Sequence, residues 1–362
     1  MRSTFRHSRW LPRFMARAVV VPLLLLLAFA HCAAAWTIDN PYEIVDWEAY
    51  GQYKANFHTH TTHSDGRMHP HTVVDEYHAL DYSILAITDH NAVTYPWTAF
   101  SELSMSELSV SRMEEAPRTM PETTEYENRD PEALGMIAVQ GNELSRHHHM
   151  GSFFSDHDGT TTEEESLEAT AAKNGITMLY HPGRYDRPVE WYVDLYDRYD
   201  HLFGLEVYNS GDRYPGDREL WDAILQETMP ERPVWGYSND DMHSLMALGR
   251  NWNVLLLPGL TTEWVRYGML NGLSYFSFAP RGQRGAPPPV IEAIHVDQEN
   301  ATIEIKATGY ETIHWISSGE KVHEGSKVDL NALETVGPYI RAKLHGEEDS
   351  VTGTQPFGIR KP

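Results

Sequence analysis

The strongest constraint on the fold is an alternation of short apolar runs with helical stretches, in which metal-binding residue types follow several of the apolar runs. His90, Glu143, His181 and Asp241 each follow such a run. Alternating strands and helices predict a parallel sheet or barrel. In a β/α barrel the carboxyl ends of the strands meet on one face, so we expect these four side chains to lie together. The predicted strands are 82–87, 136–139, 176–180, 202–207, 234–237 and 253–257, and the clearest helices are 163–173, 218–226 and 262–271, the last closed by Gly272.

The pattern changes after a Pro/Gly-rich stretch at 281–289, which we interpret as a linker. Beyond it, short alternating strands predict a small β-sandwich, of immunoglobulin-like type, over 290–362. A lead-in at 36–51 precedes the first region, which spans 52–280. Residues 102–133 are acidic and weakly periodic, and we expect an insertion over the barrel mouth, either a lid or a plain solvated excursion.

Residues 1–35 have the pattern of a secretory signal peptide. Five arginines precede an apolar stretch from Ala18 to Ala30, and three alanines follow at 33–35. About 13 apolar residues are too few to span a bilayer comfortably, and a retained N-terminal anchor is the alternative. We therefore expect a secreted or periplasmic protein with no membrane span after cleavage.

Composition limits the chemistry that is open to the mature chain. Cleavage would remove five Arg and Cys32, the only cysteine, leaving 24 basic against 52 acidic residues and a formal charge of −28. Such a chain is unsuited to grip duplex nucleic acid by charge. Without cysteine, any metal must be held by histidines and carboxylates. Of the 20 histidines, 14 lie between His58 and His243.

The segment from Phe57 to Gly66, FHTHTTHSDG, carries the strongest local signal. In an extended segment residues i and i+2 face the same side, so His58 and His60 can reach one metal. The following Ser-Asp-Gly turns the chain and can return the carboxylate of Asp65 to a neighbouring ion.

Five further fragments carry metal-ligand residue types, and each has a purely structural alternative. His90 could be a satisfied core histidine, Glu143 or Asp241 a helix cap, and the 147–149 histidine run a surface tract. Because all the fragments fall at strand ends or in loops, the metal interpretation explains them together. The fragments are Thr88-Asp89-His90, Gly141-Asn142-Glu143-Leu144-Ser145, Arg146-His147-His148-His149, His181-Pro182 and Asp241-Met242-His243.

The order of these motifs resembles the PHP (polymerase and histidinol phosphatase) superfamily over about residues 52–280, and residues 249–275 resemble its secreted, carbaryl-hydrolase-like branch. The resemblance implies an α/β fold, a distorted (β/α)7 barrel of TIM-like type, with a trinuclear metal site on its C-terminal face. It implies two to three divalent ions, and ligands of these types accept Zn, Mn or Fe alike. One metal would take His58, His60, Glu143 and Asp241; a second would share Glu143 and add His149 and His181; a third would take Asp65, His90 and His243.

Two of these assignments choose between neighbours. His149 is preferred to His147 and His148 because His-Met-Gly imitates the family's His-apolar-Gly run into a strand. Asp241 is preferred to Asp240 because only Asp241 forms Asp-x-His with His243.

Three residues are candidates for roles beyond metal binding. Arg184 and Arg250 could clamp phosphate, since a planar guanidinium suits phosphate oxygens, although each could equally be an ordinary surface arginine. Asp89, beside His90, could be a supporting partner or a proton acceptor. Glu206 and Asn209 resemble a pocket segment of secreted relatives and receive no role.

These observations predict a metal-dependent hydrolase. A bound metal lowers the pKa of water to about 7 and can hold the attacking and leaving oxygens of a phosphoester in line. We expect phosphomonoester or phosphodiester hydrolysis, including nucleotide or oligonucleotide ends, on a small, phosphate-bearing molecule. The alternatives are hydrolysis of a carbamate, ester or amide at the same site, and a non-catalytic secreted binding protein. The sequence leaves the oligomeric state open.

Overall fold

The computed structural model describes residues 36–100 and 127–361. The predicted signal peptide at 1–35, and most of the predicted insertion at 102–133, lie outside the described residues. In the part of the chain that the structure describes, no helix is long and apolar enough to cross a membrane.

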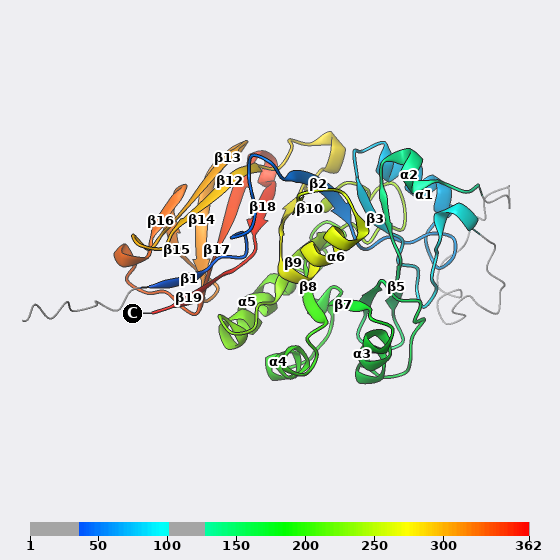
Figure 1. Cartoon of the computed structure of the whole chain (residues 1–362), viewed down its shortest axis with the longest axis horizontal. Coiled ribbons are helices and arrows are strands. Elements are labelled where there is room, and N and C mark those ends of the chain that lie inside the picture. Colours follow the sequence, from blue (N-terminus) through cyan, green and yellow to red (C-terminus); the bar gives the residue numbers. More distant parts are fainter. Residues whose placement is uncertain (1–35, 101–126, 362) are drawn as a thin grey trace, which may run out of the picture. The chain divides into compact units, whose positions relative to one another are not determined.

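Two sheets make up the α/β region (Figure 1). The first contains β2 (Gly51–Asn56), β3 (Ile84–Ala86) and β4 (Ile137–Val139) in parallel, with β10 (Asn251–Leu257) antiparallel to β2 and β11 (Ser274–Phe278) antiparallel to β10. The second runs β5 (Gly141–Leu144), β6 (Met150–Phe153), β7 (Ile176–Leu179), β8 (Leu202–Asn209) and β9 (Trp235–Asn239), and β7, β8 and β9 are parallel.

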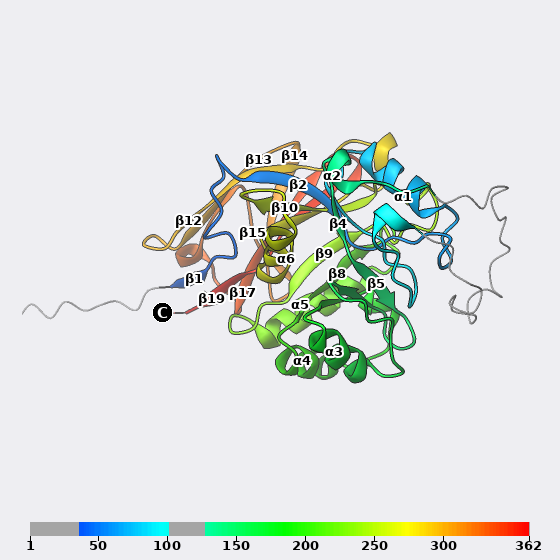
Figure 2. The ribbon, with the colours of Figure 1, turned by 45° about the vertical axis from the view of Figure 1, so that its right-hand side comes forward.

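Helices flank these strands, and their ends follow local sequence rules. Thr162 and Thr261 cap α3 and α6 by accepting the amides of Glu165 and Trp264, and Gly272 ends α6 in the left-handed conformation. Helices α3, α4 and α5 lie along one side of the second sheet (Figures 1 and 2). The helices are α1 (Pro70–His78), α2 (Pro131–Leu134), α3 (Glu163–Ala172), α4 (Val189–Arg198), α5 (Gly216–Thr228) and α6 (Thr262–Asn271), with 3-10 turns at Trp97–Ala99, Pro182–Arg184, Gly282–Arg284, Leu330–Ala332 and Glu347–Asp349.

Side chains join β9 to β10, two strands between which the described structure has no backbone hydrogen-bond ladder. The side-chain amide of Asn253 accepts a hydrogen bond from the backbone N–H of Ser238 through Oδ1 and donates one to the Ser238 carbonyl through Nδ2, both at 2.9 Å. Asn251 adds a bond to Ser238 Oγ at 3.0 Å. These asparagines satisfy strand-edge groups that a ladder would otherwise satisfy. The structure is thus a mixed α/β fold, and no continuous ladder around a closed barrel is found in its described residues.

The loop after β3 makes the connection to the second sheet. The amide of Asn91 donates to the carbonyl of Glu143 at 2.8 Å, and the amide of Glu143 donates to the carbonyl of Asp89 at 3.2 Å. The backbone that carries His90 is therefore fixed beside the strand that carries Glu143.

An antiparallel C-terminal portion continues the first sheet. Strand β18 pairs with β11, and β1 joins through β19. A three-stranded sheet, β12-β13-β16, packs on this layer over one apolar core that includes Ile303, Trp315 and Leu344, together with Leu256 of β10. The strands are β1 (Thr37–Asp39), β12 (Val290–Asp297), β13 (Thr302–Thr308), β14 (Tyr310–Ser317), β15 (Glu320–Glu324), β16 (Lys327–Asp329), β17 (Tyr339–Gly346), β18 (Val351–Thr354) and β19 (Phe357–Arg360).

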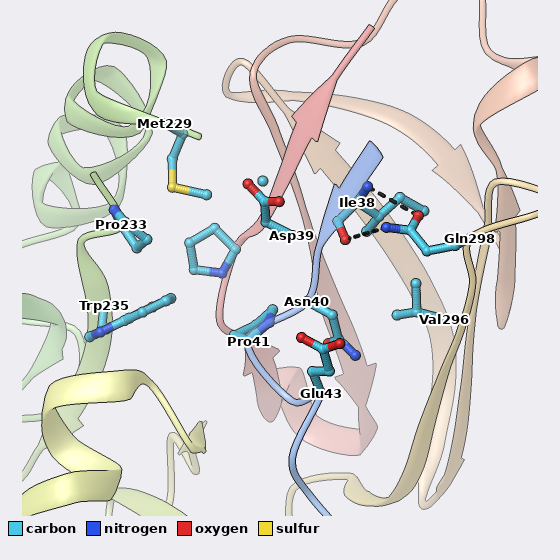
Figure 3. Close-up of a pocket in the computed structure, with 12 residues that line it drawn as sticks. Ile38, Asp39, Asn40, Pro41, Glu43, Met229, Pro233, Trp235, Val296 and Gln298 are labelled. Atoms are coloured by element: carbon cyan, nitrogen blue, oxygen red, sulfur yellow. Dashed lines mark hydrogen bonds between the residues drawn. The ribbon is translucent and has the colours of Figure 1, made fainter. Parts of the chain in front are cut away.

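Polar contacts attach the predicted linker and lead-in to the C-terminal strands. Glu348 accepts hydrogen bonds from Arg281 Nη1 and the amide of Ala286. The side-chain amide of Gln298 pairs with both backbone groups of Ile38, at 3.1 and 2.8 Å (Figure 3). The proposed domain boundaries stay a prediction, but β11, before residues 281–289, pairs with β18, after them, and Tyr275 and Ile291 belong to one core.

Candidate metal centre

Nine side chains with metal-binding atoms meet at the strand ends of the α/β region. Every ligand residue predicted from the sequence is among them. They form four overlapping groups, and within each group the candidate ligand atoms lie within 4.8 Å of one another: His60, Asp65, His90 and His243; His58, Glu143 and His181; His58, His60 and Asp241; His90, Glu143 and His149. The structure therefore brings the whole predicted set together, with more sharing between groups than the sequence assignment contains.

Glu143 lies at the centre of the cluster and is 1% exposed. Its Oε1 is 2.5 Å from His149 Nδ1 and 3.4 Å from His181 Nε2. Its Oε2 is 2.8 Å from His90 Nδ1, and 3.3 and 3.5 Å from Nε2 of His60 and His58. The two oxygens thus face different histidines, as a carboxylate that bridges two cations would.

Two aspartates complete the cluster on either side of His60. Asp241 Oδ1 lies 3.1 Å from His60 Nε2 and 3.3 Å from His58 Nε2. Asp65 Oδ1 lies 3.1 Å from His243 Nε2, 3.4 Å from His90 Nε2 and 3.7 Å from His60 Nδ1. Asp65 and Asp241 therefore serve different groups, in line with the separate sites expected for them.

Hydrogen bonds at the far ring nitrogens fix how three of the imidazoles present themselves. His58 Nδ1 lies 2.9 Å from Glu206 Oε1, and because an ionised carboxylate can only accept, that nitrogen carries the proton. His243 Nδ1 likewise faces the backbone carbonyl of Asp241 at 2.9 Å. His60 Nδ1 contacts Ser64 Oγ at 3.3 Å, and that hydroxyl donates to Asp89 Oδ1 at 2.6 Å. In the neutral form of all three rings, the lone pair is on Nε2 and is directed into the cluster, where a cation would take the place of a proton.

Glu206 is the main residue to which the sequence analysis gave no role. It is fully buried in β8. Besides His58, it accepts hydrogen bonds from the amide of His181 at 2.8 Å and from the side-chain amides of Asn209 and Asn239, both at 2.9 Å. One carboxylate therefore orients two candidate ligands. The signal in the sequence was a glutamate inside an apolar strand, where an unpaired charge is rarely tolerated.

Asp89 is fully buried and is not among the residues that line the cavity around the cluster. Its carboxylate accepts hydrogen bonds from Thr61 N and Oγ1 (both 2.7 Å), Ser64 Oγ (2.6 Å) and Thr94 Oγ1 (2.5 Å). With both oxygens occupied, it fits the supporting role and not that of a proton acceptor. It holds the loop that carries His60 and Asp65.

Two glycines allow the backbone to approach closely in the ligand loops. A Cβ on Gly66 would lie 2.5 Å from the carbonyl of His60, so the Ser-Asp-Gly turn needs glycine there. A Cβ on Gly183 would lie 2.7 Å from Asp217 Oδ1, which accepts the Gly183 amide at 2.6 Å. Asp217 and Glu206 together fix the turn in which His181 adopts a φ of 31°.

The remaining alternatives have structural partners. Asp240 accepts the amides of Gly249, Arg250 and Asn251, whereas Asp241 faces the histidines. His147 Nε2 contacts Ser166 Oγ at 2.7 Å, and His148 stacks on Tyr185. Of the three consecutive histidines, His149 is the one beside Glu143.

The electrostatics of the cluster favour ionised carboxylates. Burial by itself raises the pKa of Glu143, but His90, His149 and His58 lower it, and its net pKa lies well below the ordinary value. The pKa of Asp241 is likewise lowered by His58, His243 and His60 against the effect of burial. Burial by itself lowers the pKa of His90, but the opposite effect of Glu143 and Asp65 is larger, and the net pKa of His90 is raised to about 9. Without metal, protons on His58, His90 and His243 thus supply the positive charge that the carboxylates require, whereas burial lowers the pKa of His60 and His149.

The cluster lies in a cavity of about 670 Å³ whose lining is rich in arginine. Arg184 and Arg250, the two predicted clamps, both line it, and so do Arg67 and Arg213, which the sequence analysis did not single out. Arg250 is held by a bond from Nη2 to the carbonyl of Pro280 at 2.9 Å. Four arginines around one cavity contrast with the chain's overall excess of acidic residues.

The donor set fits divalent cations. Imidazole and carboxylate are ligands that Zn, Mn and Fe accept. Buried atoms whose near polar neighbours are other candidate ligand atoms of the cluster include His58 Nε2, His60 Nε2, Asp65 Oδ1 and both oxygens of Glu143. Buried polar atoms normally have hydrogen-bond partners, so a group of them aimed at one another indicates space for ions. The overlapping groups suit more than one metal, and these features together are those of a metal-dependent hydrolase.

Comparison with known proteins finds similarity to solved structures only. No family model and no curated protein matches the sequence. A two-domain protein from Bacteroides vulgatus that contains a predicted PHP-like metal-dependent phosphoesterase is 14% identical, with 86% of this chain and 96% of that chain covered and a TM-score of 0.49. The lesion-specific endonuclease of Pyrococcus furiosus is 13% identical, with 61% of this chain and 56% of that chain covered and a TM-score of 0.39. An amidohydrolase from Chromobacterium violaceum is 14% identical, with 53% of this chain and 88% of that chain covered and a TM-score of 0.35. The function must therefore be inferred from the side chains of the site.

Proposed function

We propose that this protein is a PHP-like metal-dependent phosphoesterase that acts on a small phosphoester outside the cytoplasm. The observation that carries the proposal is the combination of nine ligand-type side chains, seven of them buried, with four arginines in one cavity. Within this proposal, two to three Zn, Mn or Fe ions occupy the cluster, the α/β region corresponds to a distorted (β/α)7 barrel, and the C-terminal strands form an immunoglobulin-like sandwich.

Divalent metals bound at the cluster would supply Lewis acidity and lower the pKa of water toward 7. The chain supplies orientation and charge. Glu206 and Ser64 hold the far nitrogens of His58 and His60, which directs their Nε2 atoms into the site. Arg184 and Arg213 would bind phosphate oxygens by charge-assisted hydrogen bonds, offsetting the repulsion that an acidic protein exerts on an anion.

The arginine lining distinguishes phosphoester hydrolysis from its main alternative. A carbamate, ester or neutral amide carries no charge that four guanidinium groups would match. A cavity of about 670 Å³ suits a small molecule, which favours a small phosphoester or a strand end over a long duplex. Secretion, inferred from residues 1–35, belongs to the proposal as well.

Hydrolysis of p-nitrophenyl phosphate, bis-p-nitrophenyl phosphate and an aryl carbamate by the purified, metal-loaded protein tests this function. We expect turnover of a phosphoester that is abolished by His60→Ala. Arg184→Gln and Arg213→Gln should each raise KM for the phosphoester about tenfold, as loss of one charge-assisted contact implies, with smaller effects on kcat. Arg198→Gln, on the exposed face of α4, is the matched control. Turnover of the carbamate alone, or a protein that retains less than one equivalent of metal, would contradict the proposal.

A further inference from the structure

A second, smaller cavity lies where β17 packs against α5 and β8, and it shares no lining residue with the metal centre. Its volume is about 170 Å³. The charged side chains in its lining are Arg218, Arg341 and Lys343, and all three are cations. For a chain with 52 acidic and 29 basic residues, a small cavity lined by cations without a single carboxylate is unexpected.

The alternation of β17 explains how the cations reach this place. Ile340, Ala342 and Leu344 belong to the apolar core of the C-terminal portion. Because successive side chains of a strand point to opposite faces, Arg341 and Lys343 face the other way, toward α5. Arg218, in the first turn of α5, meets them there.

Two of the three cations are fixed by carboxylates outside the lining. Arg218 binds Asp212 through Nη1 at 2.7 Å and Nη2 at 3.1 Å. Arg341 binds Asp222 through Nε at 2.8 Å and Nη2 at 2.6 Å. The guanidinium groups also lie over aromatic rings, Arg218 at 4.3 Å from the ring of Tyr208 and Arg341 at 4.9 Å from that of Trp221. Both guanidinium groups are therefore held in place before any ligand arrives.

Lys343 is the uncompensated charge. No carboxylate of the described residues lies within ion-pair distance of its ammonium group, which is partly buried. Burial lowers the pKa of Lys343, and the nearby Arg218 and Arg341 lower it further. Three cations against two carboxylates leave one net positive charge at this cavity.

From this arrangement we propose that the cavity is a binding site for one small oxyanion, such as phosphate or sulfate. Its volume admits an ion of that size and excludes a nucleotide. The cations converge from a helix and a strand, so that a tetrahedral anion can contact more than one of them. The larger cavity of Figure 3, about 460 Å³, is a useful contrast, because Asp39 and Glu43 line it. Of these two cavities, only the one at the α5–β17 contact has a lining whose charges suit an anion.

The proposed anion site also contacts the loop at residues 210–214, which lines the cavity of the metal centre. Ser210, Arg213 and Tyr214 line the catalytic cavity, whereas Asp212, in the same loop, binds Arg218. An anion at Arg218 would share that guanidinium with Asp212. The C-terminal strands would thereby contribute a ligand site beside a loop that lines the catalytic cavity. The proposal does not depend on which bond the metal centre hydrolyses.

Calorimetric titration of the full-length, metal-loaded protein with inorganic sulfate tests the proposal. We expect saturable binding that Lys343→Met weakens about tenfold and Lys343→Arg largely restores. Lys306→Met, at an exposed lysine paired with Glu292, should bind as the unaltered protein does. A matching far-ultraviolet circular dichroism spectrum and unfolding temperature show that Lys343→Met is folded.

The same titration on Arg184→Gln separates the two cavities. Binding at the α5–β17 contact should be unaffected by Arg184→Gln. Absence of saturable sulfate binding would overturn the proposal. So would sulfate binding with no component that Lys343→Met weakens, or binding that is lost entirely with Arg184→Gln.

Discussion

The metal centre and the α5–β17 contact both bury charged side chains, but they neutralise them differently. At the contact, Asp222 and Arg341 are 8% and 6% exposed and form a two-point ion pair, to which Tyr339 OH adds a hydrogen bond at 2.6 Å. At the metal centre, Glu143 is equally buried, and its two oxygens face only imidazole nitrogens, the nearest at 2.5 Å in His149 and 2.8 Å in His90. A buried charge needs a partner, so the first pair is complete within the chain, whereas the carboxylates of the second site need either protons on the imidazoles or bound cations.

The same contrast recurs within the metal centre itself. Glu206 and Glu143 are both buried carboxylates next to His58. Glu206 accepts hydrogen bonds from three chain amides in addition to its contact with His58, whereas Glu143 faces only imidazole nitrogens. A carboxylate saturated by donors supports the site, and one without donors is available to a cation.

The largest expected effect tests the claim that Glu143 requires metal. Glu143→Gln removes the charge shared by the ligand groups, so we expect metal content to fall below one equivalent and kcat/KM to fall on the order of 10³-fold or more. Metal analysis and steady-state kinetics measure this, with Glu132→Gln at an exposed position as the control. The unfolding temperature should fall only in metal-containing buffer. A variant that retains its full metal content would remove the distinction between the two regions.

The next effect concerns the internally neutralised pair. Arg341→Met leaves Asp222 buried without its cation, and we expect a loss of about 3–5 kcal/mol in the free energy of unfolding. Urea denaturation measures it, and Arg281→Met, at an exposed ion pair, should cost about 1 kcal/mol or less. Metal content should not change. The double variant Arg341→Met/Asp222→Leu should regain much of the loss, and failure to do so would show that packing dominates.

Glu206→Gln should produce an intermediate effect that is distinct from Glu143→Gln. The amide would direct an N–H₂ group at Asn209 or Asn239 and would hold His58 less firmly, so we expect metal affinity to fall about 10- to 100-fold. Titration with Zn²⁺ or Mn²⁺ measures this. Unlike Glu143→Gln, it should also lower the unfolding temperature without metal. Equal stability in metal-free buffer would indicate that the hydrogen bonds of Glu206 contribute little.

The smallest effect is a pH dependence at Asp217. Burial raises the pKa of Asp217 to about 8, partly offset by the amide of Gly183. The folded state therefore holds a proton that the unfolded state has released above about pH 4, and stability falls as pH rises from about 4 to 8. Asp217→Asn keeps an acceptor for Gly183 and should flatten this dependence, stabilising the protein by roughly 1–2 kcal/mol at pH 8. Parallel pH profiles for both proteins would contradict the assignment.

Periodicity predicted much of the fold because local patterns report local structure. The predicted strand at 176–180 corresponds to β7, the helix at 262–271 to α6, and the break at Gly272 to its left-handed end. The absence of a backbone ladder between β9 and β10 in the described structure was not predictable in the same way. Asn251 and Asn253 look like polar interruptions in a strand, and only the position of Ser238 opposite them shows that they join β9 to β10.

The sequence by itself determined which residue types were available to the site and in what order. With no cysteine after Cys32, histidines and carboxylates at strand ends were the available metal ligands, and the i, i+2 spacing of His58 and His60 already placed them on one side. Only the tertiary structure decided which ligand groups share Glu143, and that the carboxylate of Asp240 accepts hydrogen bonds from backbone amides and does not face the cluster. It also decided that Glu206, Arg67 and Arg213 belong to the site. The physical reason is that a side chain's role depends on the donors and charges around it, and those come from segments far away in the sequence.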